Sequence, residues 1–148
     1  MRSGETSIMT IVKTVNGFTA ANVSWGKWGI LNKGKADHYV IGKPGAFGPR
    51  RFDSPTRVTT PYQTILQVWQ RYKDDGVTME SLETNIDNII AKFDAKRNLG
   101  DTTGEVVRAD LRRGSEAQEM WKGRGGGPLW LKVDLIIEWE TKEIITFA

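Results

Sequence analysis

The clearest pattern along the chain is an alternation with a period of two residues near its C-terminus. Six consecutive odd-numbered positions are apolar, and four even positions carry charges, namely Lys132, Asp134, Glu138 and Glu140. The apolar positions are Leu129, Leu131, Val133, Leu135, Ile137 and Trp139. Because successive side chains of a strand point to opposite faces of a sheet, this alternation predicts a long strand with one buried face.

A second strand is expected over Tyr62–Lys73, and its apolar residues fall on both faces. Leu66 and Val68 share one face, while Ile65 and Trp69 lie on the other. Apolar residues on both faces are typical of a strand that is covered on both sides.

Two segments show the helical period of 3.6 residues instead. The first 17 residues fit a short amphipathic helix, although their β-branched residues also suit a strand. A stronger amphipathic helix is expected at about 79–97, with Thr78 as its N-cap. The buried stripes would be Ile8, Ile11, Val12 and Val15 in the first helix and Leu82, Ile86, Ile89, Ile90 and Phe93 in the second.

The remaining chain is rich in Gly and Pro, and residues 33–57 and 112–128 are expected to be extended loops. Short strands are expected at Val23–Leu31, His38–Gly42 and Val106–Arg113. These elements predict one domain over residues 1–148 with an α+β fold. Its mixed or antiparallel sheet would carry two helices packed on one face and end in a long C-terminal hairpin.

Composition narrows the class of protein. The 148 residues include no Cys and one His, which excludes a disulfide scaffold, a thiolate metal site and a multi-histidine zinc site. No apolar run approaches the roughly 20 residues of a membrane helix, and the N-terminus lacks the apolar core of a signal peptide. We therefore expect a soluble protein without a membrane partner that is made in the cytoplasm.

Residues suited to catalysis are few and isolated. His38 stands beside Asp37 without a nucleophile in a recognisable pattern. Two acidic pairs come without further ligands at a metal-binding spacing, and they are Asp74 with Asp75 and Glu138 with Glu140. The sequence thus predicts no catalytic residues, no metal and no cofactor.

The net charge of +3 hides an uneven distribution. Residues 1–73 carry 11 Lys or Arg against 3 Asp or Glu (+8), while residues 74–148 carry 10 against 15 (−5). Such a division suits head-to-tail contact between identical subunits, unless folding intermixes the two sets of charges. The basic stretch between Lys27 and Arg57 also contains aromatic residues, a mixture that suits either non-specific nucleic-acid binding or an acidic protein partner.

Four tryptophans lie in or beside Gly-rich, charged stretches. They are Trp25, Trp28, Trp121 and Trp130. Trp and Arg are enriched at protein interfaces, so exposed Trp on loops favours an assembly surface. The alternative is that these rings cover the ends of the core.

The order of elements resembles that of the tail-terminator, or tail-completion, proteins of long-tailed bacteriophages. The resemblance lies in architecture and covers most of the chain. It is carried by the opening helix at Ile8–Val15, YQTILQVWQRY (62–72), LETNIDNIIAKF (82–93), the insertion RRGSEAQEMWKGRGGG (112–127) and LWLKVDLIIEWE (129–140). The chain departs from the family in its longer and more basic segment at 33–57.

The resemblance implies a structural virion protein rather than an enzyme. Such proteins form a hexameric ring that caps the tail tube, stops its growth and joins the tail to the head-completion or connector protein, with DNA passing through the lumen. The longer basic segment leaves two alternatives open, which are a head–tail connector component of the neck and a non-specific nucleic-acid-binding module.

If the resemblance holds, the exposed residues fall into two groups of contacts. Contacts with other subunits or with the tube protein are assigned to Trp25, Trp28, Phe47, Trp121 and Trp130. Contacts with DNA in the lumen or with an acidic partner are assigned to Lys33, Lys35, Arg50, Arg51, Lys122 and Arg124.

Overall fold

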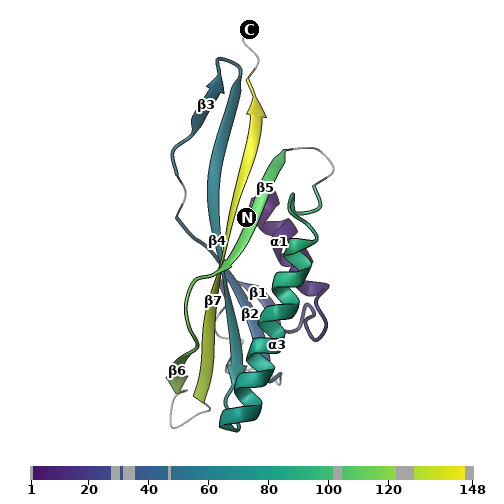
Figure 1. Ribbon diagram of the computed structural model, residues 1–148, viewed down its shortest axis with the longest axis vertical. Helices are drawn as coiled ribbons and strands as arrows, with labels where there is room; N and C mark the ends of the chain where they lie inside the picture. Colours follow the sequence, from purple (N-terminus) through teal and green to yellow (C-terminus); the bar gives the residue numbers. More distant parts are fainter. Residues whose placement is uncertain are drawn as a thin grey trace.

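Two long antiparallel strands, β4 (Arg57–Arg71) and β7 (Leu129–Ile144), form the centre of the fold (Figure 1). They pair along their whole length, from Arg57 opposite Ile144 to Arg71 opposite Trp130. A computed structural model of the chain describes residues 2–27, 31, 36–46, 48–101, 105–122 and 129–145, apart from the side chains of 75 and 118–122.

Shorter elements are arranged around this central pair. Two helices are present in the described ranges, α1 (Ser3–Lys13) and α3 (Asp75–Asp94). The other strands are β1 (Val23–Trp25), β2 (His38–Pro44), β3 (Arg51–Ser54), β5 (Val106–Arg113) and β6 (Gln118–Lys122). Among the residues described, seven strands thus form one sheet in the order β1-β2-β4-β7-β5, with β3 also paired to β4 and β6 to β7. The β1–β2 pair is parallel and the other pairs are antiparallel, so the sheet is mixed.

Both helices cover the same face of the sheet and enclose the main core. Register partners Val40, Val68 and Val133 lie side by side under them, as three strands present the same face. The helices contribute their apolar stripes, for example Ile8 from α1 and Ile86 from α3. Burial of these stripes, at about 25 cal/mol per Å² of apolar surface, is the main force that holds the helices on the sheet.

The opposite face carries a second, smaller core at the end of the sheet near β2. It consists of Leu31, Tyr39, Ile41, Trp69 and Trp130, with Ala36 packed against them. Strand β4 therefore has buried residues on both faces, as the apolar residues on both sides of Tyr62–Lys73 predicted.

The predicted fold class is confirmed. The protein is α+β, with two helices on one face of a mixed sheet and a C-terminal hairpin in which β6 precedes β7. The first helix ends at Lys13, and the strand expected over Val23–Leu31 is confirmed only for Val23–Trp25, because the chain leaves the sheet at Gly26, whose φ of 68° is not that of a strand.

Three local expectations were wrong. The second helix begins at Asp75, not 79, because the Asp74 side chain accepts a hydrogen bond from the Gly76 N–H and caps the helix one turn earlier. The predicted loop at 112–128 contains strand β6, and the predicted loop at 33–57 contains strand β3. Both strands form because an edge of β7 or β4 offers backbone partners, which local composition does not reveal.

Candidate assembly surface

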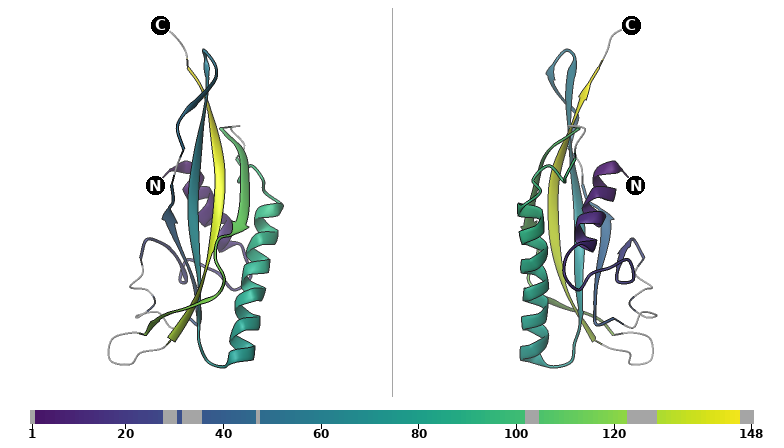
Figure 2. Two further views of the ribbon diagram at one scale, coloured as in Figure 1. Left: turned by 60° about the vertical axis from the view of Figure 1, so that its left-hand side comes forward. Right: turned by 90° about the vertical axis from the view of Figure 1, so that its right-hand side faces the viewer.

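The sheet extends beyond both helices at one end (Figures 1 and 2). There, three strand segments form a narrow ribbon, called the tip ribbon, which consists of β3, residues 57–60 of β4 and residues 141–144 of β7. Arg51, Thr59 and Lys142 form one rung across it, and Phe52, Val58 and Glu143 form the next. The figures show no helix against either face of this ribbon, although Val58 and Thr59 within it are buried.

Two apolar side chains are exposed on the tip ribbon. Phe52 is 62% exposed and Ile144 is 71% exposed. Phe52 pairs with Val58 and Ile144 pairs with Arg57, and because these two partners are neighbours in β4, the apolar side chains lie on opposite faces. Exposed apolar groups on both faces of a thin ribbon are typical of a surface that another protein chain covers.

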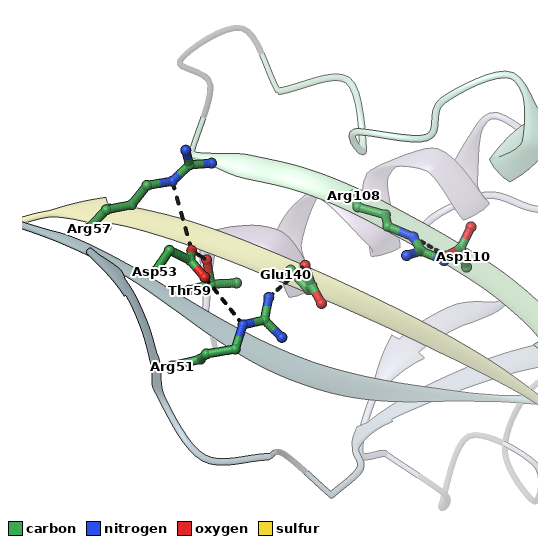
Figure 3. A network of polar contacts seen from close by, with 7 residues as sticks. All are labelled: Arg51, Asp53, Arg57, Thr59, Arg108, Asp110 and Glu140. Carbon is green, nitrogen blue, oxygen red and sulfur yellow. Dashed lines mark hydrogen bonds and ion pairs between the residues drawn. The ribbon is translucent and has the colours of Figure 1, made fainter.

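A network of charges holds β3 against β4 and β7 in the tip ribbon (Figure 3). Asp53 lies at its centre, where its carboxylate accepts a hydrogen bond from the Thr59 hydroxyl and another, of 3.3 Å, from Nε of Arg51. Nε of Arg57 lies 3.8 Å from Asp53, and the Arg51 guanidinium also reaches Glu140 at 4.0 Å. The bond from Thr59 holds the pKa of Asp53 below the ordinary value of an aspartate, and the two arginines lower it further.

A shallow groove of about 400 Å³, lined by both apolar and charged residues, adjoins this network. Ala46, Gly48, Pro61 and Gln63 line it on the β4 side, and Arg108, Asp110, Glu138 and Glu140 line it on the side of β7 and β5. Its charges are paired with opposite charges, because Arg108 bonds to Asp110 and Arg112 lies 3.4 Å from Glu138. The groove thus presents paired charges of both signs, an arrangement suited to polar contact with another surface.

Two of the predicted contact residues lie in the interior of the protein, Trp25 partly and Trp130 wholly. Trp25 is half-buried, and its ring lies so close to Gly42 that a Cβ added there would be 2.8 Å from it. Trp130 is fully buried, with its ring 5.7 Å from that of Tyr39 and under the Arg71 guanidinium. The assignment of Trp130 to an exposed contact surface was wrong, because the second core covers this end of β7.

Arg50 and Arg51 are exposed, and both face carboxylates. Arg50 lies 3.7 Å from Glu143 and Arg51 lies 4.0 Å from Glu140, so basic residues of the N-terminal half pair with acidic residues of the C-terminal half. The two sets of charges therefore intermix on the tip ribbon instead of staying apart.

The other predicted contact residues cannot be placed. Trp28, Lys33, Lys35, Phe47 and Arg124 lie outside the described residues. Trp121 and Lys122 belong to strand β6, and their side chains lie outside the description.

The candidate catalytic residues have structural contacts. Nε2 of His38 lies 2.6 Å from the Gly17 carbonyl oxygen, and its ring packs edge-on against Phe18. Asp74 caps α3, and Glu138 pairs with Arg112. In the ranges that the structure describes, no group of three or more His, Asp or Glu side chains is placed to hold a metal ion.

The sequence interpretation missed Phe52 and Ile144 as exposed apolar residues. Phe52 lay within a predicted loop, and Ile144 lies beyond the last residue of the predicted terminal strand. A signal was nevertheless present, because Ile144 stands at an even position, on the polar face of the alternation.

None of the helices described has the length and apolarity needed to cross a membrane. No model of a known protein family matches the chain, and a comparison with curated proteins finds no match either.

Proposed function

We propose that this protein is a structural subunit that assembles with copies of itself into a ring at the tail of a long-tailed bacteriophage. The ring would cap the tail tube, end its growth and join the tail to the head-completion protein, as the resemblance to tail terminators implies. The protein would then reside in the virion, and its task would require no bond chemistry. A neighbouring place in the neck, as a connector component, would use the same kind of assembly.

The observation that carries this proposal is the tip ribbon. A two- or three-stranded ribbon without a covering layer gains little stability by itself, because it buries little apolar surface. Phe52 and Ile144 are exposed there on opposite faces, whereas the rest of the fold has a well-filled core. A subunit contact would bury these side chains and thereby explain why the sheet extends so far beyond the helices.

A nucleic-acid-binding function has less support. Arg50 and Arg51, two of the basic residues of the stretch Lys27–Arg57 to which such binding was assigned, lie within 4.0 Å of carboxylates of β7. A phosphate backbone would have to replace these intramolecular partners, which lowers the gain from each contact.

The test is the length of tail tubes. Tube protein from the same genome is polymerised with and without this protein, and tube lengths are measured by electron microscopy. A tail terminator shortens the tubes in proportion to its concentration and is seen at one tube end. Unchanged tube lengths, with no density at the ends, would contradict the capping role.

A further inference from the structure

We propose that Asn16 and Gly17, in the turn that follows α1, form a site of spontaneous deamidation. In this modification the backbone nitrogen of Gly17 attacks the side-chain amide of Asn16, and the side chain loses ammonia. Both residues are exposed, and α1 ends before them, at Lys13. The modification concerns the single chain and is independent of the proposed self-assembly.

The reaction needs only the chain and water. The Gly17 nitrogen gives up its proton and forms a bond to Cγ of Asn16, while the bond from Cγ to Nδ2 breaks. Nδ2 leaves as ammonia with the proton that Gly17 lost, and a succinimide ring remains. Water then opens this ring at either of its carbonyl carbons. One opening gives aspartate, and the other gives isoaspartate, in which the main chain runs through the side-chain carbon.

The structure leaves both reacting groups available. In the part of the chain that it describes, neither the Asn16 side chain nor the Gly17 N–H has a hydrogen-bond partner. The carbonyl oxygen of Gly17, in contrast, accepts a 2.8 Å bond from Nδ2 of Asn22 and lies 2.6 Å from Nε2 of His38. Attack by the Gly17 nitrogen therefore breaks neither of these contacts, because both are made by the other end of the residue.

The fold itself requires glycine at position 17. Gly17 has a φ of 89°, a conformation that residues with a side chain rarely adopt. A Cβ added there would also lie 3.3 Å from Nε2 of His38. The lack of a side chain leaves the Gly17 nitrogen open to the neighbouring Asn16 amide. Glycine is thus both a structural requirement of this turn and the reason for its reactivity.

The other asparagines that the structure describes are protected by the fold. Asn22 is buried, and its side chain both donates and accepts a hydrogen bond. The Asn98 side chain is likewise bonded through both of its polar atoms. Asn85 and Asn88 lie within α3, where the helix holds the backbone N–H groups that follow them. Among the described asparagines, deamidation is therefore expected at Asn16.

Deamidation would place a negative charge in a groove of about 370 Å³ between the end of α1 and α3. Asn16 and Val15 line this groove on one side, and Asn88, Ala91 and Lys92 line it on the other. A carboxylate at position 16 would share the groove with the Lys92 ammonium, but an exposed ion pair contributes little stability. Isoaspartate lengthens the main chain beside the buried Val15, so we expect it to be the less stable product.

The test is incubation of the folded full chain in mildly alkaline buffer, followed by trypsin digestion and mass spectrometry. Trypsin cleaves after Lys13 and Lys27, so one peptide contains both Asn16 and Asn22. Reaction at Asn22 must first break two hydrogen bonds, so we expect Asn16 to convert about tenfold or more faster. Both aspartate and isoaspartate should form at position 16. Asn16→Gln should abolish the conversion, because its longer side chain closes a larger ring more slowly, whereas the matched control Asn98→Gln should leave it unchanged.

A parallel incubation in guanidinium chloride separates the effect of the fold from that of the sequence. In the folded chain a 3.0 Å hydrogen bond from the Phe18 N–H to the Val15 carbonyl closes the turn around the reacting pair. Opening this single bond frees the pair, so we expect the folded chain to convert within about tenfold of the unfolded rate. Asn16 that stays intact in the folded chain, or Asn22 that converts as fast as Asn16, would overturn the inference. Either result leaves the proposed ring assembly in place.

Discussion

At the scale of single residues, α1 is held on the sheet by a close contact between Gly4 and Trp139. The indole of Trp139 is buried, donates a 3.0 Å hydrogen bond to the Thr64 hydroxyl and stacks on Tyr62 with ring centres 4.5 Å apart. A Cβ added at Gly4 would lie 2.4 Å from the indole ring. This position requires glycine because the ring cannot move without losing its hydrogen bond and its stacking contact.

We therefore expect Gly4→Ala to destabilise the fold by about 1–3 kcal/mol, since overpacking forces the ring or the helix to shift. Urea denaturation measures the change. Gly76→Ala is the matched control, because a Cβ there would meet only the Asp74 carboxylate at 3.9 Å and alanine favours the helix. Equal effects of the two substitutions would contradict the Gly4–Trp139 contact.

Asp53 gives a residue-scale prediction about pH. Its pKa is lower in the folded chain because of the Thr59 hydrogen bond and the two arginines, so it stabilises the tip ribbon above the unfolded pKa of about 3.9. That contribution is lost as the pH falls through the folded pKa. We expect Asp53→Asn to loosen β3 near neutral pH and to lose its effect in acid. Side-chain carboxyl NMR would show Asp53 titrating below the ordinary range, whereas an ordinary titration would contradict the network.

At the scale of elements, the sequence predicted those strands and helices that show a clear pattern of apolar residues of their own. The alternation in β7 and the apolar stripe of α3 are examples, because each element buries one face of its own. The start of β4, residues 57–61, was not predicted, because Thr59, Thr60 and Pro61 do not continue the apolar pattern that begins at Tyr62. Pro61 lacks an N–H, and it stands where neither β2 nor β3 pairs with β4.

The candidate surface was harder to predict than the elements. The burial of Trp130 depends on Leu31 and Tyr39, about a hundred positions earlier in the chain, and the exposure of Phe52 depends on how far the sheet extends beyond the helices. Such long-range packing leaves no periodic signal in the neighbouring sequence.

The start of α3 gives a prediction at the element scale. Thr78 is buried, and its hydroxyl accepts from two backbone N–H groups. Thr78→Val keeps the shape but leaves these donors without that acceptor, so we expect a loss of about 1–3 kcal/mol in thermal or urea unfolding. Thr78→Ser keeps the hydroxyl and should retain most of the stability. A valine variant as stable as the serine variant would show that these bonds contribute little.

At the scale of the whole molecule, the protein is elongated. Core residues cover both faces of the sheet at one end, and the tip ribbon, which no helix covers, lies at the other end (Figure 2). The charges of the two halves of the chain are intermixed across the tip ribbon, as in the Arg50–Glu143 pair. The division of +8 and −5 along the sequence therefore does not become a division of the surface there.

The proposed function requires the chain to assemble with itself into a closed ring. Native mass spectrometry of the full chain, over a series of concentrations and at low and moderate salt, tests it most directly. We expect one discrete oligomer, with six copies expected from the resemblance to tail terminators. A chain that stays monomeric throughout the series, both alone and with polymerised tube protein present, would contradict it.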